Sequence, residues 1–528
     1  MTDSPTDMAD NETLVQALQH ALQQHTGAPV QLLQTHISWV LLAGDCAYKL
    51  KKPVRFPFLD FSTPALRQHF CEEELRLNRR LAPELYLDVL PVQGTPAAPR
   101  LSLSTADASP AAHPEAVASI DHLVRMHRFA ADSLLSERVQ QGLAGQDDMR
   151  VLAQRLATFH QCLPGTPPEA AYGSPALVLE EVLKVLQPLD TSAFSASVPQ
   201  WRGWVQGQAQ RLHAVWQQRR DAGWVRECHG DLHLGNVVKL ADSVTAFDCI
   251  DFQPAMRWID VANDVAFLTM DLQVQGRPDL AAGFMDDYLQ ASGDYDALAI
   301  WRFYEVYRAL VRAMVAQLSC GGTDPQAGLP YAQWLDRATG NQLPQPRLVL
   351  MHGVSGSGKS TVARQWLEHS GAVRVRSDVE RKRLFGLEAG QNSQAQGLDI
   401  YTAEATAQTF ARLQQVARTA LQGGYPVVVD AAFLRQSERQ NFRQLADALG
   451  VPFTIADCDA DEATLVQRVQ ARQQQGHDAS EATAQVLAQQ LRQREPLTPQ
   501  EQPFIVRVDT ARTAPAEAVQ RLLLAPQG

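Results

Sequence analysis

The sequence predicts two consecutive domains of different class: an α+β domain with a small β lobe and a large helical lobe, and then an α/β domain with a parallel sheet. With 528 residues the chain is too long for one hydrophobic core. A strand hairpin near the start is followed by long stretches of helical periodicity up to about residue 340, whereas short apolar strands alternate with helices from about residue 345 onward. We therefore expect one domain over residues 1–340 and another over residues 345–528.

Hydrophobic residues make up 45% of the chain and charged residues 20%, as in ordinary soluble globular proteins. The net charge of -11 argues against broad, sequence-independent binding to nucleic acid or anionic membranes, which requires a basic surface. The seven cysteines are scattered, odd in number and without metal-ligand pairs, so we expect reduced thiols. Because the sequence also shows no signal peptide and no membrane-spanning apolar run, we expect a cytoplasmic protein. No pattern indicates a partner protein.

The first domain is expected to begin with an amphipathic helix, since apolar residues recur at helical spacing over residues 14–22. Strands over 37–43 and 46–51 flank Gly44-Asp45, a pair suited to a tight hairpin turn. A further strand over 118–126 leads to the expected hinge between the lobes. Helical periodicity then dominates, at 149–160, 176–186, 201–219, 279–291 and 297–318.

The stretch from His229 to Phe252 carries the chemistry of this domain. It reads His-Gly-Asp-Leu-His-Leu-Gly-Asn and, after a variable turn, Phe-Asp-Cys-Ile-Asp-Phe. Asp231 and Asn236 are five residues apart, as in a kinase catalytic loop, where the carboxylate accepts the proton of the substrate hydroxyl and the amide holds magnesium. Asp251 follows an apolar pair, at the place of a second metal ligand. A loop that caps a helix would explain any one of these residues, but not their joint spacing.

With His229 and Gly230 in front of the catalytic aspartate, this stretch resembles the aminoglycoside phosphotransferase and choline kinase group of protein-kinase-like enzymes. The resemblance implies a protein-kinase-like fold, ATP and Mg2+ as cofactors, and a small-molecule hydroxyl acceptor. It also implies an aspartate that steadies the catalytic loop. In the stretch from Trp258 to Asp264, Asp260 is the better match for that role, and a simple helix cap is its alternative interpretation.

A lysine and a glutamate upstream could complete the nucleotide site. In kinases a strand lysine holds the nucleotide phosphates and is held by a glutamate on the following helix. Our preferred pair is Lys49, on the second hairpin strand, with Glu74, on the helix expected after residue 64. Lys51 shares a strand face with Lys49 because side chains alternate, and Glu73 is one helix step from Glu74, so these alternatives stay open. A surface lysine near a solvated acidic turn is the interpretation without function.

An acidic stretch follows. From Asp264 to Asp296, both included, there are seven acidic residues, and Arg277 is the only basic one. Such a stretch could bind a cationic acceptor such as an aminosugar, whereas a solvated helix face is the more ordinary interpretation and the one that we favour.

A linker rich in glycine and proline, with one short helix, spans residues 321–346, and the second domain begins after it. A strand over 347–351 runs into Gly353-Val-Ser-Gly-Ser-Gly-Lys-Ser-Thr361, and a helix follows to about residue 369. In this pattern backbone amides and the helix N-terminus cradle phosphates, Lys359 reaches the β and γ groups, and the Ser360 hydroxyl ligates magnesium. The predicted nucleotide-binding residues are Gly353, Ser355, Gly356, Ser357, Gly358, Lys359, Ser360 and Thr361.

Three more strands are expected, over 373–375, 426–429 and 453–456, alternating with helices. This order implies a parallel sheet covered on both faces. Ligands bind at the carboxyl ends of such strands, where Asp378 and Asp430 lie. We expect Asp430 to be a metal ligand.

This half resembles P-loop kinases such as gluconate kinase, the kinase half of polynucleotide kinase and zeta-type toxins. The resemblance implies that Asp378 is the base and Arg381 the substrate contact, from an Asp-x-x-Arg pattern after the second strand. It also implies that Arg468 and Arg472, four residues apart on one helix, close over the transferring phosphoryl group. The paired order of domains is similar to the bacterial bifunctional aminoglycoside phosphotransferase/ATP-binding proteins.

The sequence therefore predicts an ATP-dependent phosphotransferase with two magnesium-dependent sites. We further expect an acceptor with negative charge at the second site, with a base of depressed pKa, because a run of basic residues surrounds Asp378. That run consists of Arg374, Arg376, Arg381, Lys382 and Arg383.

Two other interpretations remain. In the first, a nucleotide-driven regulatory ATPase carries an N-terminal kinase-like binding module. Such ATPases commonly place a glutamate after the strand-end aspartate, but here Asp430 is followed by two alanines, which weakens this interpretation. In the second, the first domain is a pseudokinase, although Lys49, Asp231, Asn236 and Asp251 are all present.

Overall fold

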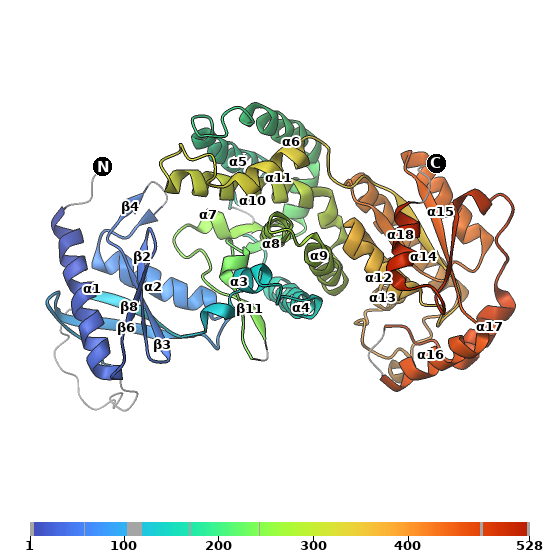
Figure 1. Ribbon diagram of the computed structural model, residues 1–528, viewed down its shortest axis with the longest axis horizontal. Coiled ribbons are helices and arrows are strands. Elements are labelled where there is room, and N and C mark those ends of the chain that lie inside the picture. Colours follow the sequence, from blue (N-terminus) through green and yellow to red (C-terminus); the bar gives the residue numbers. More distant parts are fainter. Residues whose placement is uncertain are drawn as a thin grey trace. The chain divides into compact units, whose positions relative to one another are not determined.

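The computed structural model describes residues 5–56, 59–102, 119–167, 170–241, 243–475 and 479–524. Contacts between residues divide the chain into two compact units, and Figure 1 labels their helices and strands. The first unit consists of Met1–Ala144, Cys162–Gly173 and Arg220–Asp264, and the second of Gly145–Gln161, Ser174–Arg219 and Val265–Gly528. No helix within these described ranges is both long enough and apolar enough to cross a membrane.

The β lobe of the first unit is a six-stranded sheet of order β1-β2-β3-β8-β6-β7. The hairpin β2–β3 turns at Gly44, whose positive φ of 57° suits the predicted tight turn. Helix α1 (Pro5–Thr26) packs its apolar residues, including Leu18 and Leu22, against the sheet. The strands are β1 (Gln31–Gln34), β2 (Ser38–Ala43), β3 (Cys46–Lys51), β6 (Tyr86–Thr95), β7 (Ala98–Arg100) and β8 (Asp121–His127). The predicted strand over 118–126 corresponds to β8, although Ala118 lies outside the described residues.

Helix α2 (Pro64–Asn78) packs against β6 and β8. The helix begins after Thr63, whose hydroxyl accepts a hydrogen bond from Leu66 N and so caps the helix. Pro64 stands in the first turn, where its missing N–H has no helical partner to lose. The remainder of this unit contains short elements around the catalytic stretch. They include β4 (Arg55–Phe56), β5 (Leu59–Asp60), α3 (Leu135–Gln140), β9 (Val225–Glu227), β10 (Val237–Lys239), β11 (Val244–Ala246), α7 (Pro254–Arg257) and β12 (Trp258–Asp260).

The second unit contains long helices that match the five predicted helical stretches within a few residues. They are α4 (Gln146–Cys162), α5 (Pro175–Leu189), α6 (Val198–Asp221), α9 (Pro278–Ser292) and α10 (Leu298–Ser319), with the short linker helix α11 (Leu329–Thr339). Helix α8 (Val261–Val274) was not predicted. Residues 261–272 are all buried, so the segment lacks the apolar and polar faces by which a helix is recognised in a sequence.

The P-loop part of the second unit has a five-stranded, wholly parallel sheet of order β14-β15-β13-β16-β17. This confirms the predicted parallel sheet, and β17 adds a strand that was not predicted. The strands are β13 (Leu348–His352), β14 (Val373–Arg376), β15 (Val427–Asp430), β16 (Phe453–Asp459) and β17 (Ile505–Asp509). The helices are α12 (Lys359–Ser370), α13 (Ser377–Leu384), α14 (Ala403–Gln422), α15 (Gln436–Leu449), α16 (Glu462–Gln475), α17 (Ala484–Gln493) and α18 (Pro515–Leu523).

Within this unit, helix α9 packs on helix α12. Ala282 of α9 belongs to the same buried apolar cluster as Val349 and Trp366. The fully buried Asp286 accepts from Arg374 Nη2 at 2.7 Å and from Arg364 Nη1 at 3.1 Å. A carboxylate this deeply buried requires such cationic partners.

These contacts correct both interpretations for three residues of the acidic stretch. Asp286 and Asp287 pair with Arg364, and Asp294 pairs with Arg219 at 2.7 Å. Their negative charge is used inside the fold, so these residues form neither a site for a cationic acceptor nor a solvated face.

Candidate active sites

Two lysines of β3 converge on one glutamate of α2. Lys49 Nζ lies 2.8 Å from Glu74 Oε1, and Lys51 Nζ lies 2.7 Å from Glu74 Oε2. Lys49 also pairs with Asp248 at 2.5 Å, and Lys51 pairs with Asp251. The alternation of side chains along β3 thus brings both predicted candidates to Glu74. Glu74 is thus the glutamate that pairs with the lysines. Its neighbour Glu73 pairs with Arg76 and Arg257 instead.

The electrostatics of this cluster favour an ionised Glu74 and charged lysines. Burial alone would raise the pKa of Glu74, but Lys49 and Lys51 outweigh it and lower the pKa to about 2. Burial would likewise lower the pKa of Lys49, but Asp248 and Glu74 hold it well above the ordinary value. Lys51 is the more deeply buried lysine, with 2% of its side chain exposed against 12% for Lys49. Both ammonium groups are therefore charged, as the binding of phosphate requires.

The catalytic loop places Asp231 beside Asn236, as the five-residue spacing predicts. Asn236 Nδ2 donates to Asp231 Oδ2 and to Asp231 O, each at 3.0 Å. His229 anchors the start of the loop: its Nε2 contacts Phe247 O at 2.9 Å, and its Nδ1 accepts from Asp231 N at 3.3 Å. A carbonyl can only accept, so this network assigns the proton to Nε2.

Asp264 steadies the catalytic loop. Its carboxylate accepts from His229 N at 3.0 Å and from Gly230 N at 2.8 Å. Asp260 precedes α8 and accepts from Ala262 N at 2.9 Å, as a helix cap does. The choice of Asp260 for the steadying role was therefore wrong by one helical turn. Counting from the motif could not separate the two aspartates, because the bend of the chain after β12 decides which one returns to the loop.

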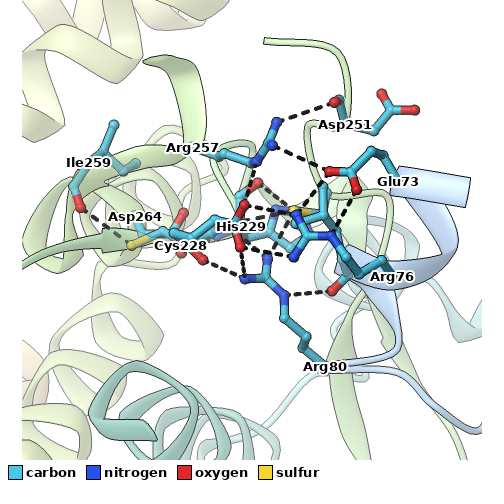
Figure 2. Close-up of polar contacts among 12 residues, drawn as sticks. Glu73, Arg76, Arg80, Cys228, His229, Asp251, Arg257, Ile259 and Asp264 are labelled. Atoms are coloured by element: carbon cyan, nitrogen blue, oxygen red, sulfur yellow. Dashed lines mark hydrogen bonds and ion pairs between the residues drawn. The ribbon is translucent and has the colours of Figure 1, made fainter. Parts of the chain in front are cut away.

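A network of charged side chains surrounds the start of the catalytic loop (Figure 2). Arg257 contacts Glu227 Oε1 through Nε at 3.1 Å, Asp251 O through Nη1 at 3.2 Å and Glu73 Oε2 through Nη2 at 3.5 Å. Arg76 contacts Glu73 and Glu227, each at 2.9 Å. Sequence reasoning did not find this network, because its members come from three separate segments and match no spaced motif.

The second candidate site is built on the predicted P-loop. Gly353, Gly356 and Gly358 have positive φ values of 137°, 82° and 81°. A Cβ atom on Gly353 would lie 2.3 Å from Cys458 O, so only glycine fits there. Lys359 Nζ donates to Val354 O at 2.8 Å, which folds its side chain back over the loop.

Ser360 and Asp430 meet at the carboxyl ends of the strands. Ser360 Oγ donates to Asp430 Oδ1 at 3.2 Å. Asp430 Oδ2 is buried without a hydrogen-bond partner among the described residues, and Arg376 Nε is 3.8 Å from it. Hydroxyl and carboxylate oxygens are the ligands that magnesium prefers. These two side chains would therefore fit a magnesium ion.

Arg468 and Arg472 do different things, although both lie on α16. Arg468 holds the P-loop region, since Nη1 donates to Gly356 O at 3.2 Å and to Thr510 Oγ1 at 2.9 Å. Arg472 has two buried nitrogens, Nε and Nη2, without a hydrogen-bond partner in the described part of the chain. Ser357 Oγ is likewise buried and has no hydrogen-bond partner among the described residues. Buried donors without partners are uncommon in folded proteins, and these would fit phosphate oxygens.

Two residues near the P-loop were missed by sequence reasoning. Thr510 follows β17, and its hydroxyl donates to Ser357 O at 3.0 Å. Gln490 of α17 accepts from Ser355 N through Oε1 at 2.7 Å. Each lies more than 130 residues after the loop residue that it contacts, and no local pattern relates either of them to the loop.

The predicted substrate contact Arg381 lies on α13, one helical turn after Asp378. Its Nη1 donates to Ile400 O at 2.9 Å, and its guanidinium lies over the Tyr401 ring, 5.1 Å from the centroid. Arg381 Nε is buried and has no hydrogen-bond partner among the residues described. Burial lowers the pKa of Arg381, and Asp378 opposes this shift.

The structure corrects the prediction that five basic residues surround Asp378. Arg374 is turned to Asp286, Lys382 pairs with Glu481 at 3.2 Å, and Arg383 pairs with Glu380 at 3.1 Å. Successive residues of a strand or helix point in different directions, so a run in the sequence does not make one patch. They are not solvated surface either, because Arg374 and Lys382 are buried.

Comparison with known proteins matches both halves. Residues 64–301 match the phosphotransferase enzyme family, and residues 348–497 match an AAA domain. An uncharacterized protein of Mycobacterium tuberculosis is 29% identical over 469 residues, which cover 87% of this chain and 89% of that protein.

Similar solved structures include a choline/ethanolamine kinase family protein from Mesorhizobium loti, with 12% identity, 63% of this chain and 94% of that chain covered, and a TM-score of 0.34. A gluconokinase from Sinorhizobium meliloti has 25% identity, 34% of this chain and 91% of that chain covered, and a TM-score of 0.25. The two family matches confirm the predicted order of domains. The chain thus joins a domain of the phosphotransferase enzyme family to an AAA-type P-loop domain, and it is an enzyme of the phosphotransferase class.

Proposed function

We propose that this protein carries two ATP-dependent phosphotransferase sites, and that each site transfers the γ-phosphoryl group of ATP to a hydroxyl group of a small molecule. The observation that carries the proposal is that each half gathers a complete set of groups for this chemistry. In the first half, Asp231 contacts Asn236, and Lys51 lies between Glu74 and Asp251. In the second half, Lys359 lies within the P-loop and Ser360 meets Asp430.

At the first site, we assign Asp231 as the group that orients the acceptor hydroxyl and takes its proton. Lys49 would bind the nucleotide phosphates, with Glu74 holding it in place. Asn236 and Asp251 would hold magnesium, which neutralises charge on the phosphates. Asn236 uses Nδ2 for Asp231, so its Oδ1 is the atom suited to the metal.

At the second site, we assign Lys359 and Arg472 to the phosphates, and Ser360 with Asp430 to magnesium. Asp378 would orient the acceptor, and Arg381 would contact it. Arg472 Nε and Nη2 and Arg381 Nε, which are buried without a hydrogen-bond partner in the described ranges, support these assignments. Positioning and charge stabilisation contribute most of the catalysis in such transfers, so these cationic groups matter as much as the base.

The residues of the first site do not indicate the charge of its acceptor. At the second site, Arg381 favours an anionic acceptor. A guanidinium can bind a phosphate or carboxylate in a bidentate manner. We also place the protein in the cytoplasm, which the free thiols of its seven cysteines support.

The proposal can be tested with ATP labelled on its γ-phosphate, incubated with a metabolite extract and an aminosugar panel. Four full-length chains are compared: the parent, Asp231→Asn, Lys359→Ala, and the double variant. A labelled product that disappears with Asp231→Asn alone belongs to the first site, and one that disappears with Lys359→Ala alone belongs to the second. Steady ATP hydrolysis that yields no labelled metabolite with any acceptor would contradict the proposal and support a regulatory ATPase.

A further inference from the structure

Arg257 contacts three separate segments around the first site. Its guanidinium reaches Glu73 on α2, Glu227 on β9 and the backbone carbonyl of Asp251 (Figure 2). We infer that Arg257 is a positioning residue, which holds helix α2, the catalytic loop and the metal-binding carboxylate in the relative positions that magnesium and nucleotide require. This inference rests on the proposed function of the first site.

The link to α2 acts through two adjacent glutamates. Successive residues of a helix point about 100° apart, so Glu74 faces the lysines of β3 while Glu73 faces Arg76 and Arg257. Anchoring Glu73 therefore fixes both the rotation of α2 about its axis and its position along that axis. If α2 turned or slid, Glu74 would move away from Lys49 and Lys51.

The link to the catalytic loop acts through Glu227, two residues before His229. Glu227 lies opposite Trp258 in the β9–β12 pair, so Arg257 stands next to it in space. Glu227 also accepts from Arg76 at 2.9 Å and from Arg80 at 3.2 Å. Arg80 Nη2 in turn donates to Cys228 O at 3.3 Å, on the residue that enters the loop.

The link to the metal ligand acts through the backbone. Arg257 Nη1 donates to Asp251 O at 3.2 Å, while the Asp251 carboxylate faces Lys51. The segment before Arg257 also touches the loop directly. Gly230 has a φ of 87°, and a Cβ atom there would lie 2.8 Å from Met256 O. Residues 256–257 therefore pack against backbone on both sides of the site, at Gly230 and at Asp251.

The charges favour a fixed arrangement over a loose surface pair. Only 6% of the Arg257 side chain and 13% of the Glu227 side chain are exposed. Burial alone would raise the pKa of Glu227, but Arg76, Arg257 and Arg80 lower it. Networks of this kind are held more firmly than an isolated exposed ion pair. A lysine at position 257 would keep the charge but could not reach three partners in three directions.

The test uses the full-length Lys359→Ala chain, so that only the first site binds nucleotide. ATP binding is measured by calorimetry at increasing magnesium concentration for this parent and for added Arg257→Gln, Arg257→Lys and Arg55→Gln. Arg55 is the matched control, because its side chain is 74% exposed, it belongs to the same unit, and its ion pair is with nearby Asp60. We expect both Arg257 variants to require roughly 10- to 100-fold more magnesium, and Arg55→Gln to behave like the parent.

A double-mutant cycle separates positioning from general stability. If Arg257 acts by holding Glu74, the effects of Arg257→Gln and Glu74→Gln on ATP affinity are not additive. An unchanged magnesium requirement, or additive effects accompanied only by a lower unfolding midpoint, would overturn the inference. Should the Arg257 variants fail to fold, Glu73→Gln removes the α2 link while Arg257 keeps its other two contacts, and a parent-like magnesium requirement there would overturn the inference as well. A parent chain that binds no ATP would instead reject the proposed function of this site.

Discussion

The side-chain amide of Asn236 donates to the Asp231 carboxylate at 3.0 Å. This contact holds the carboxylate in one orientation and turns the amide oxygen of Asn236 to the opposite side. We therefore expect Asp231→Asn to lower transfer at the first site by roughly 10²- to 10⁴-fold, because the proton acceptor is lost while the shape of the loop is kept. Initial rates with the identified acceptor, combined with ATP titration, check this. Near-normal transfer would remove Asp231 from the role of base.

We expect substitution of Lys51 to affect mainly the stability of the fold and substitution of Lys49 to affect mainly ATP binding. Lys51→Met would leave the buried carboxylates of Glu74 and Asp251 without a common partner, so we expect a loss of about 3–5 kcal/mol in the free energy of unfolding. Lys49→Met should reduce ATP affinity with a smaller loss of stability, because its second partner Asp248 is 45% exposed. Denaturant unfolding and ATP titration, both in the Lys359→Ala background, check the pair. The opposite pattern would make Lys51 the phosphate contact.

Arg468 and Arg472 provide a second matched comparison. Arg472→Ala should weaken ATP binding at the second site without lowering the unfolding midpoint of the nucleotide-free protein, since its buried Nε and Nη2 have no hydrogen-bond partner to lose among the described residues. Arg468→Ala should lower that midpoint, because contacts to Gly356 and Thr510 disappear. Thermal unfolding with and without ATP, in an Asp231→Asn chain, distinguishes them. Equal losses for both variants would mean that Arg472 is only structural.

At the second site, the roles of Arg381 and Asp378 can be separated by their different effects on KM and kcat. Arg381→Lys should chiefly raise the KM for the acceptor, because lysine cannot reproduce bidentate contacts, whereas Asp378→Asn should chiefly lower kcat. Steady-state kinetics of the full-length chain on the acceptor identified for this site provide the measurement. A neutral or cationic acceptor would contradict the proposed role of Arg381.

Stability should depend on pH through His229. Burial lowers the pKa of His229, and this outweighs the opposite influence of Asp264, Asp231 and Asp248. When the pH falls below the ordinary value near 6.5, the unfolded chain takes up a proton that the folded one resists, so stability falls, by at most about 1.4 kcal/mol per pH unit. Protonation of Nδ1 would also remove its hydrogen bond from Asp231 N.

His229→Asn should therefore flatten the pH dependence of stability between pH values of about 7 and 5.5. Other histidines are unchanged in this variant, so the difference between the two chains isolates His229. Denaturant unfolding at both pH values measures it. Parallel curves for the parent and the variant would show that His229 does not titrate in this way.

Local features of both sites were predictable because their spacing is set by the chain itself. Asp231 and Asn236 belong to one loop, and the residues from Gly353 to Thr361 belong to one turn and helix start. Alternation along β3 likewise showed that Lys49 and Lys51 share a face. The roles assigned to these residues stay predictions until the variants are measured.

Features that depend on the return of distant segments were not predictable. Which of Asp260 and Asp264 reaches the catalytic loop depends on the path of the chain after β12, and no pattern in the sequence indicates that path. Helix α8 is buried on all sides, so its periodicity is hidden. Arg374 seemed to belong with Asp378 because they are close in the sequence, yet its partner Asp286 is 88 residues away.

The buried pairing of Asp286 with Arg364 and Arg374 has a consequence for how this protein can be divided. A cut in the segment after α11 would place the Asp286 carboxylate on one fragment and its two guanidinium partners on the other, and would expose these charged groups to solvent unpaired. The P-loop fragment would also lose Ala282 from its apolar cluster. Either half made alone would lack these contacts, so recombination that exchanges the P-loop half has to bring along the surface of α9 that it fits.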